Sequence, residues 1–407
     1  MRSAVSIAIL AALLLTTPGA AQQTELDGSI WTRFETRDIT SGAATTFTWM
    51  QSRLGAAMTF SPLVRAYVRV QDSRRLGEEI GLGDTSADRL DLQQGYVELG
   101  TPGESPVWLR LGRQEYEVAF GRLIGIPIWS PVSRAYDGLV AAMSVGTGSR
   151  LDLFGFQITE STQTTNADDS YLFGAWGQVP LSDAQTLHLI GVHDRDNAVS
   201  QTARTTLFSQ LDGRGGGVRY RAEGGIQVGT VEGQDIVSGS LLAIYAAVPW
   251  GEDNRGTLGL GVDRYGGNAN PGAGESAGFS DLFGRNHRFL GFADLFTDPR
   301  ANLDGRGLLD VDVRVTWQLR PDLQLRGDYH HFRLNDAQGY AGAKLADEID
   351  LQLWGQVLEG LDIRAGASWV GAEDPLVDFG RTAGDQLFGY LQLSAGFWGG
   401  APGGRPR

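Results

Sequence analysis

The sequence contains no cysteine among its 407 residues, and histidine is limited to five. Disulfides and thiolate metal sites are therefore excluded, so the stability of the fold must come from another source. Two acidic clusters could bind calcium in loops, one at Asp194, Asp196 and Asn197 and another at Glu78, Glu79 and Asp84. Neither follows the EF-hand pattern, and solvated acidic loops are the alternative interpretation. We expect no metal and no cofactor.

Long apolar runs are also absent, apart from one near the N-terminus. Arg2 precedes an apolar run from Ala4 to Leu15, and small residues follow at positions 19–21. This run is too short to span a bilayer, and its flanks are those of a secretory signal. The pattern predicts a signal peptide over residues 1–21, cleaved after Ala21, with an uncleaved signal anchor as the alternative. No later segment is long and apolar enough to be a membrane helix.

Positive charge is in deficit, since 34 basic residues face 48 acidic ones and the net charge is −14. This balance disfavours nucleic acid as a partner. Lysine is almost missing, because Lys344 is the only one and all other basic residues are arginine. Either a bias of base composition or a selected role in anion contact would produce this preference.

What the chain does have is alternation of apolar and polar residues. In residues 309–319 (LDVDVRVTWQL), three valines alternate with Asp310, Asp312 and Arg314. A period of two indicates a β-strand. Such segments recur about eighteen times, each with roughly the 9–14 residues that a tilted strand needs to cross an outer membrane. The predicted strands are 26–37, 46–60, 63–74, 88–100, 106–117, 136–147, 149–160, 169–180, 183–195, 203–211, 216–230, 236–249, 255–266, 307–320, 323–335, 346–359, 361–373 and 385–397.

The connections and the faces of these strands indicate a membrane barrel. Short connections such as 61–62 and 359–360 alternate with long ones such as 118–135 and 267–306. One face of each strand is apolar and suits lipid, while the other carries charge at mid-strand and suits a wet lumen. Closing the sheet pairs every backbone donor, as hydrocarbon requires. The sequence therefore predicts an all-β, antiparallel, up-and-down transmembrane β-barrel over residues 22–397, followed by a disordered Gly/Pro-rich tail at 398–407.

Several motifs make a family resemblance specific between Gln71 and Gly138. They are VQDSR at 70–74, DLQQGYVEL at 91–99, LGRQE at 111–115, FGRL at 120–123, Trp129 and RAYDG at 134–138. With EIDL at 348–351, the chain resembles the bacterial alginate-export family of outer-membrane porins. The resemblance implies an 18-stranded monomeric barrel with an arginine-rich pore. In the alginate exporter that pore passes an anionic polysaccharide, a substrate that does not transfer automatically to this chain.

Arginines are the candidate residues of the substrate path. By alternation or by position near the outer mouth, we predict that eight of them line the lumen: Arg33, Arg53, Arg65, Arg69, Arg110, Arg113, Arg122 and Arg134. A ring of arginines selects anions. The alternative is that they brace the wall by pairing with the carboxylates Glu35, Asp72, Asp91, Glu115 and Asp137, with Arg113–Glu115 and Arg134–Asp137 as the expected pairs. In the second half of the chain, the predicted inner faces carry more carboxylates. Arg314, Arg326 and Arg364 are expected on the same faces.

The loop 267–306 is long and rich in phenylalanine. We predict that it folds into the lumen or over the mouth, rather than remaining disordered. No serine–histidine arrangement can be recognised from spacing, and we expect no enzyme activity. The expected function is passive passage of anionic solutes or an alginate-like polysaccharide across the outer membrane. The alternative is a structural or adhesin barrel with a closed lumen. Expected partners are outer-membrane lipid, lipopolysaccharide and the barrel-assembly machinery.

Overall fold

The computed structural model describes residues 23–38, 44–77, 90–159, 169–197, 201–381 and 383–398. The predicted signal peptide, the cluster at Glu78, Glu79 and Asp84, and positions 399–407 of the predicted tail lie outside these ranges. Among the described residues, no helix is long and apolar enough to cross a membrane.

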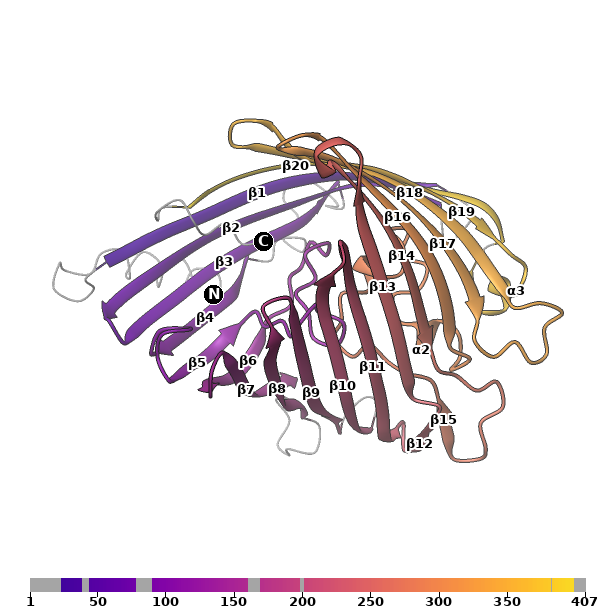
Figure 1. Cartoon of the computed structure of the whole chain (residues 1–407), viewed down its shortest axis with the longest axis horizontal. Helices are drawn as coiled ribbons and strands as arrows, with labels where there is room; N and C mark the ends of the chain where they lie inside the picture. The colour runs from indigo at the N-terminus through magenta and orange to yellow at the C-terminus, as the bar shows by residue number, and fades with distance from the viewer. Residues whose placement is uncertain are drawn as a thin grey trace.

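The wall of the molecule consists of eighteen antiparallel strands (Figure 1). They are β1 (Gln23–Arg37), β2 (Thr45–Ser61), β3 (Val64–Leu76), β4 (Leu90–Leu99), β5 (Val107–Gln114), β6 (Tyr136–Val145), β7 (Ser149–Thr159), β8 (Ser170–Ser182), β9 (Gln185–Asp196), β10 (Thr202–Gly215), β11 (Val218–Val231), β13 (Ser240–Trp250), β14 (Gly256–Tyr265), β16 (Leu308–Arg320), β17 (Leu323–Leu334), β18 (Lys344–Leu358), β19 (Leu361–Ala372) and β20 (Gly384–Trp398).

Each wall strand pairs with its neighbours in the chain, and the last pairs with the first. The register of β1 on β20 runs from Asp27↔Trp398 to Arg37↔Phe388, so the sheet closes on itself. The predicted closed barrel is confirmed. Trp398, placed by prediction in the tail, instead belongs to β20 because it pairs with Asp27.

Short elements lie in the connections. The strands β12 (Gln234–Val237) and β15 (Glu275–Ala277) pair parallel to each other. The helices α2 (Pro299–Asn302) and α3 (Pro375–Asp378) are single turns, as are the 3-10 segments Glu252–Asn254 and Asn286–Arg288. The predicted strand 236–249 is in fact broken, since β12 leaves the wall before β13 begins.

Inside and outside follow the predicted alternation. In β16, Val311 and Val315 are exposed on the outer face, whereas Asp310 and Asp312 are buried on the inner face. Closure satisfies the backbone of every wall strand, and the outward apolar side chains then meet lipid. The tight turns, such as 62–63 and 321–322, lie at one end of the barrel, and the long connections lie at the other.

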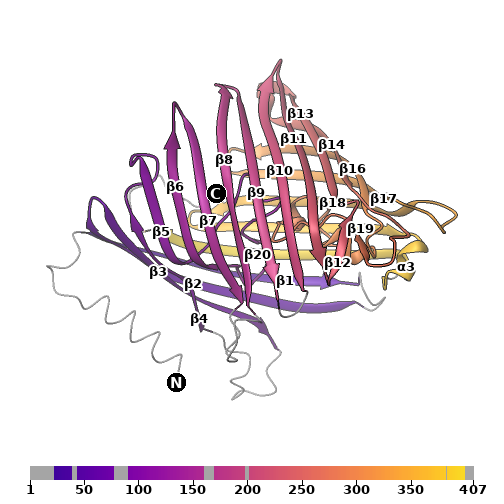
Figure 2. The same cartoon turned by 90° about the horizontal axis from the view of Figure 1, so that it is seen from below.

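The main hydrophobic cluster lies inside the barrel rather than between two layers. Aromatic side chains of the connections, such as Phe279, Phe289 and Phe296, are at most 5% exposed and pack with inward residues of the wall, such as Phe332 and Phe388. Connections seen within the ring of strands in Figures 1 and 2 therefore fill part of the lumen.

Candidate functional site: an arginine-lined chamber in the lumen

Two long connections enter the barrel and bind each other there. One is residues 115–135, between β5 and β6, which we call the first inward loop; the other is residues 266–307, between β14 and β16, the second inward loop. Ile124 and Phe283 form a parallel bridge, and the N–H of Phe283 donates to the Leu123 carbonyl at 2.9 Å. Arg285 also pairs with Glu117 at 2.9 Å. The prediction that the 267–306 loop folds into the lumen is confirmed.

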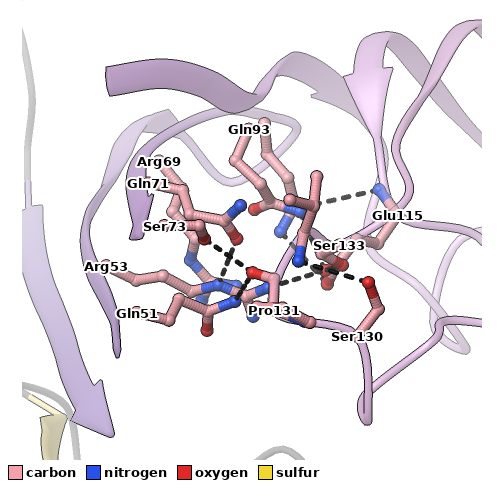
Figure 3. Close-up of polar contacts among 12 residues, drawn as sticks. Gln51, Arg53, Arg69, Gln71, Ser73, Gln93, Glu115, Ser130, Pro131 and Ser133 are labelled. Atoms are coloured by element: carbon pink, nitrogen blue, oxygen red, sulfur yellow. Dashed lines mark hydrogen bonds and ion pairs between the residues drawn. The ribbon is translucent and has the colours of Figure 1, made fainter. Parts of the chain in front are cut away.

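The first inward loop is attached to the inner face of β2–β4 by polar contacts (Figure 3). The Pro131 carbonyl accepts hydrogen bonds from Gln51 at 2.5 Å and from the Ser73 hydroxyl at 2.6 Å. Within the loop, Ser133 donates to Glu115 at 2.5 Å, and Glu115 also accepts from Gln93 of β4 at 2.8 Å. Gln51 and Ser73 point inward because successive residues of a strand face opposite sides of the sheet. They fix the path of the loop across the lumen.

The same loop is tied to the opposite wall by one buried arginine. Arg122 pairs with Glu223 of β11 and with Asp263 of β14, each at 2.8 Å, and donates to the Tyr265 hydroxyl at 3.0 Å. Arg122 is 1% exposed. An ion pair so far from water needs several partners to offset its desolvation, and this guanidinium has them.

The second inward loop is held by β11, β14 and β18. Gln227 bonds the backbone of Ser280 through both ends of its amide, at 2.7 and 2.9 Å. On β18, Glu348 accepts the N–H of Ala293 at 2.8 Å, next to Asp350, which faces the N–H of Phe292 at 3.4 Å. The two loops thus form a crosspiece attached to several sides of the barrel.

A cavity of ≈ 570 Å³ lies between this crosspiece and the inner face of β17–β20. We call it the chamber. Its aromatic walls come from the loops and from the strands: Trp129, Phe292, Trp354 and Tyr390. Its charged walls are Arg134, Arg285, Arg288, Arg326 and Arg364, with His287 and a single carboxylate, Asp294.

The chamber is strongly cationic because its arginines outnumber its carboxylate. Asp294 is already engaged by His287 at 2.8 Å. Arg285 and Arg326 have carboxylate partners, Glu117 and Asp328. Arg288 and Arg364, by contrast, pair with no carboxylate within the ranges that the structure describes. They leave positive charge for an anion to neutralise.

Arg288 is partly buried and has several positively charged neighbours. Its guanidinium carbon lies 3.4 Å from the centre of the Phe120 ring. Burial, with the nearby charges of Arg285 and Arg221, lowers the pKa of Arg288 to about 10. The side chain therefore stays charged at neutral pH, and bringing an anion close would relieve the repulsion that its neighbours impose.

Of the eight arginines predicted for the lumen, only Arg134 lines the chamber. It donates to the Phe283 carbonyl rather than pairing with Asp137. Most of the others are bonded within the inner wall, so they leave little free charge there. Arg33 bonds Glu35 at 2.6 Å, Arg69 bonds Asp27 at 2.9 Å and Arg110 bonds Glu98 at 2.8 Å.

Three more of the eight predicted arginines differ from these, because their contacts with carboxylates are longer or because they are buried inside the barrel. Arg53 donates to Gln71 at 2.8 Å and lies 3.9 Å from Glu115. Arg65 is partly exposed, at 3.8 Å from Glu98. Arg122 is the buried tie described above.

The prediction for Arg113 is wrong. Arg113 is on the same face of β5 as Val107 and Leu111, which are exposed on the outside. It pairs there with Asp137 at 2.7 Å and lies 3.7 Å from Asp91, and it does not pair with Glu115. Asp72 likewise pairs on the outer face with Arg74 at 2.7 Å. Position in the chain, rather than parity along the strand, suggested a lumen location for Arg113.

Sequence reasoning missed the loop arginines of the chamber. Arg285 and Arg288 lie in an irregular segment that has no period, so no face could be assigned to them. Arg326 and Arg364 were expected to face inward, but in the half of the barrel whose inner face was predicted to be acidic. The available signal was the density of arginine and phenylalanine in residues 279–296. Among the described residues, no three His, Asp or Glu side chains are grouped to hold a metal ion.

A closed, up-and-down barrel with an apolar outside and a charged, loop-filled inside is an outer-membrane channel protein of the porin type. Solved structures with this fold include Acinetobacter baumannii OccAB4, with a TM-score of 0.67 at 12% identity over 94% of this chain and 100% of that one. Pseudomonas aeruginosa OccK3 (OpdO) is similar, with a TM-score of 0.67 at 13% identity, covering 93% and 97%. P. aeruginosa OpdK, in a structure with vanillate, has a TM-score of 0.64 at 14% identity, covering 93% and 100%.

The family is given by the sequence. The family described as "Alginate export" matches residues 22–389, which is most of the chain. The protein therefore belongs to the alginate-export family, as the motifs predicted. A comparison with curated proteins gives no match.

Proposed function

We propose that this protein is a passive outer-membrane channel for organic anions that carry a carboxylate on a ring. The observation that carries the proposal is the charge of the chamber, where five arginines face one carboxylate that is already bonded. Arginine binds carboxylate bidentately and stays charged at any physiological pH. Two of these arginines, Arg288 and Arg364, have no carboxylate partner in the described part of the chain.

The aromatic residues of the chamber support a ring as the second part of the ligand. Trp129, Trp354 and Tyr390 present flat apolar surfaces next to the arginines. The cavity volume is in the range of small-molecule sites, roughly 300–1,000 Å³. OpdK, which shares the fold, has been crystallised with vanillate, an aromatic carboxylate. A single sugar acid or aromatic acid fits this combination, and a linear polysaccharide would have to displace the crosspiece.

The test is conductance of the purified protein in a planar lipid bilayer under a salt gradient. We expect a reversal potential on the anion-selective side, and a fall in chloride current when vanillate is added. The double variant Arg288→Gln/Arg364→Gln should lose most of the selectivity and of the vanillate block. Arg219→Gln is the matched control, because Arg219 also faces inward but lies at the short-turn end, outside the chamber.

Three outcomes would contradict the proposal. Cation selectivity would contradict an anion channel. An equal effect of Arg219→Gln would show that the chamber does not determine the selectivity. Absence of conductance, even in a variant lacking the second inward loop, would favour a structural barrel with a closed lumen. Block by alginate chains at lower concentration than by vanillate would assign the chamber to a polymer instead.

A further inference from the structure

Charged side chains on the outer surface of the barrel lie near the strand ends, and several of them gather at the end with the long connections. Outward positions at mid-barrel are apolar, for example Leu260, Ile244 and Leu351. The outward ion pairs Arg74–Asp72 and Arg113–Asp137 both lie near the ends of strands that lead into long connections. This end faces the outer leaflet of the membrane, because long connections of such barrels are extracellular.

Three cations form a row at this end, across four adjacent strands. The register pairs Arg264 of β14 with Leu309 of β16, Leu309 with Arg333 of β17, and Arg333 with Lys344 of β18. Arg264 follows the exposed outward residues Leu258, Leu260 and Val262 at alternate positions, so it is on the same face. Arg333 follows Tyr329 in the same way. Neighbouring strands lie about 4.8 Å apart, so the two arginines are roughly 10 Å apart.

The lysine of this row is neutralised and the arginines are not. Lys344 pairs with Asp347 at 2.9 Å and with Glu373 at 2.8 Å. Arg264 and Arg333 are exposed, and neither bonds a carboxylate in the parts of the chain that the structure describes. Elsewhere on the outer face, Arg74 and Arg113 have such partners. The row therefore carries two unpaired positive charges at the level of lipid headgroups.

An apolar surface continues from the row toward the middle of the membrane. Val262 lies next below Arg264 on the outer face of β14, Val311 lies below Leu309, and Ile349 lies on β18. Acyl chains can pack along these exposed side chains, while the arginines meet the headgroup. Arginine suits phosphate because its planar fork donates two parallel hydrogen bonds to an oxyanion.

We propose that the outer face of β14–β18 is a binding site for the lipid A part of lipopolysaccharide, with one phosphate on Arg264 and the other on Arg333. Lipid A carries its two phosphates at opposite ends of a disaccharide, which matches two cations separated by two strand spacings. Its several acyl chains match the broad apolar surface below the row. A glycerophospholipid with one phosphate would use only half of the site. The site is on the outside of the barrel and is independent of what the chamber binds.

The test is native mass spectrometry of the detergent-purified protein titrated with bisphosphorylated lipid A. The variants are Arg264→Gln and Arg333→Gln. The matched control is Arg195→Gln, since Arg195 is also exposed on the outer face at the same end, on β9, where its side chain bonds Asn197 at 2.8 Å. We expect each row variant to weaken lipid A binding roughly tenfold, as loss of one charge-assisted contact should, and Arg195→Gln to leave it unchanged. Monophosphorylated lipid A should bind the native protein about as weakly as a row variant binds the intact lipid.

Other results would overturn the site. Unchanged binding in both row variants, or equal weakening by Arg195→Gln, would show that the row is not the binding surface. Equal binding of phosphatidylglycerol would reduce it to a general anionic-lipid contact, and competition by inorganic phosphate would show a free-anion site without a role for the acyl chains. Single-channel conductance of all variants checks that the barrels are intact, because these outward residues do not touch the lumen.

Discussion

Arg122 and Glu223 are 101 positions apart in the chain, and their side chains meet inside the barrel at 2.8 Å. One residue belongs to an irregular loop and the other to the wall. Their contact, together with that of Arg122 and Asp263, fixes the depth to which the first inward loop reaches. The shape of the chamber depends on this tie.

Arg122→Met should loosen the crosspiece and destabilise the folded protein. The substitution removes the cation of buried Asp263 and one of the two cations beside buried Glu223, which keeps Arg221 at 3.0 Å. Breaking a buried pair in this way costs about 3–5 kcal/mol. Denaturant unfolding in detergent measures the loss, and we expect noisier single-channel currents as well. The exposed pair provides the control, since Arg113→Met should cost about 1 kcal/mol or less. An equal loss of unfolding free energy in the two variants would show that the buried ion pairs of Arg122 stabilise the fold no more than the exposed pair does.

Gly291→Ala should displace the second inward loop from β18. Gly291 has a φ of +81°, and a Cβ placed on it would lie 2.5 Å from Oε1 of Glu348, the acceptor of the Ala293 N–H. Gly339→Ala is the matched control, because its φ is +92° but nothing lies within 4 Å of the added Cβ. Both variants bear the cost of a left-handed alanine, about 1–2 kcal/mol. Only Gly291→Ala should also raise conductance or protease cleavage of the loop; identical behaviour would argue against the Glu348 contact.

Asp281 should make the docking of the second inward loop sensitive to pH. Its carboxyl is 2% exposed and accepts the Tyr265 hydroxyl at 2.9 Å. Burial raises the pKa of Asp281 to about 8, while in an unfolded chain the group ionises near pH 4. The folded state therefore holds a proton that the unfolded state releases, so the free energy of unfolding falls as pH rises between about 4 and 8.

The measurement is the unfolding free energy of the native protein minus that of Asp281→Asn, followed from pH 5 to 9. Asparagine resembles the neutral acid and cannot ionise, so this difference should decline with pH and level off above about 8. A difference that stays constant from pH 5 to 9 would mean that Asp281 is already a carboxylate in the folded state, held by Arg122.

Leu260→Arg should strongly disfavour insertion in lipid. Leu260 is 59% exposed on the outer face in the middle of β14. An arginine facing lipid at this depth costs about 2–4 kcal/mol, and near an interface only about 0–1 kcal/mol. Leu319→Arg is the matched control, because Leu319 is also outward but lies at the end of β16. Folding titrations into lipid vesicles measure both. A larger effect at position 319 would reverse the assigned depth.

The period of two was enough to predict the wall. Alternation in residues such as Asp310 to Val315 assigns each side chain to lipid or lumen, because successive residues of a strand point to opposite faces. The number of strands and the ends with short and long connections follow from the same pattern. Where parity was not applied strictly, as for Arg113, the prediction was wrong.

The chamber could not be predicted in this way. Arg134, Arg285, Arg288 and Arg364 come from two loops and one strand that are far apart in the sequence. A loop has no repeating geometry from which a direction can be read, and its path is set by contacts such as Arg122–Glu223 that form only after the barrel closes.

The sequence by itself determined that the chain is a closed barrel with a wet inside and a lipid-facing outside, because backbone pairing and the burial of apolar surface act strand by strand. Tertiary structure alone decided which arginines are free. Most inward arginines are neutralised by carboxylates on the same or a neighbouring strand. Arg288 and Arg364, which both line the chamber, have no carboxylate partner among the described residues. Charge depends on the partners within a few ångströms, and those partners are brought together by the closure of the sheet and the entry of the loops.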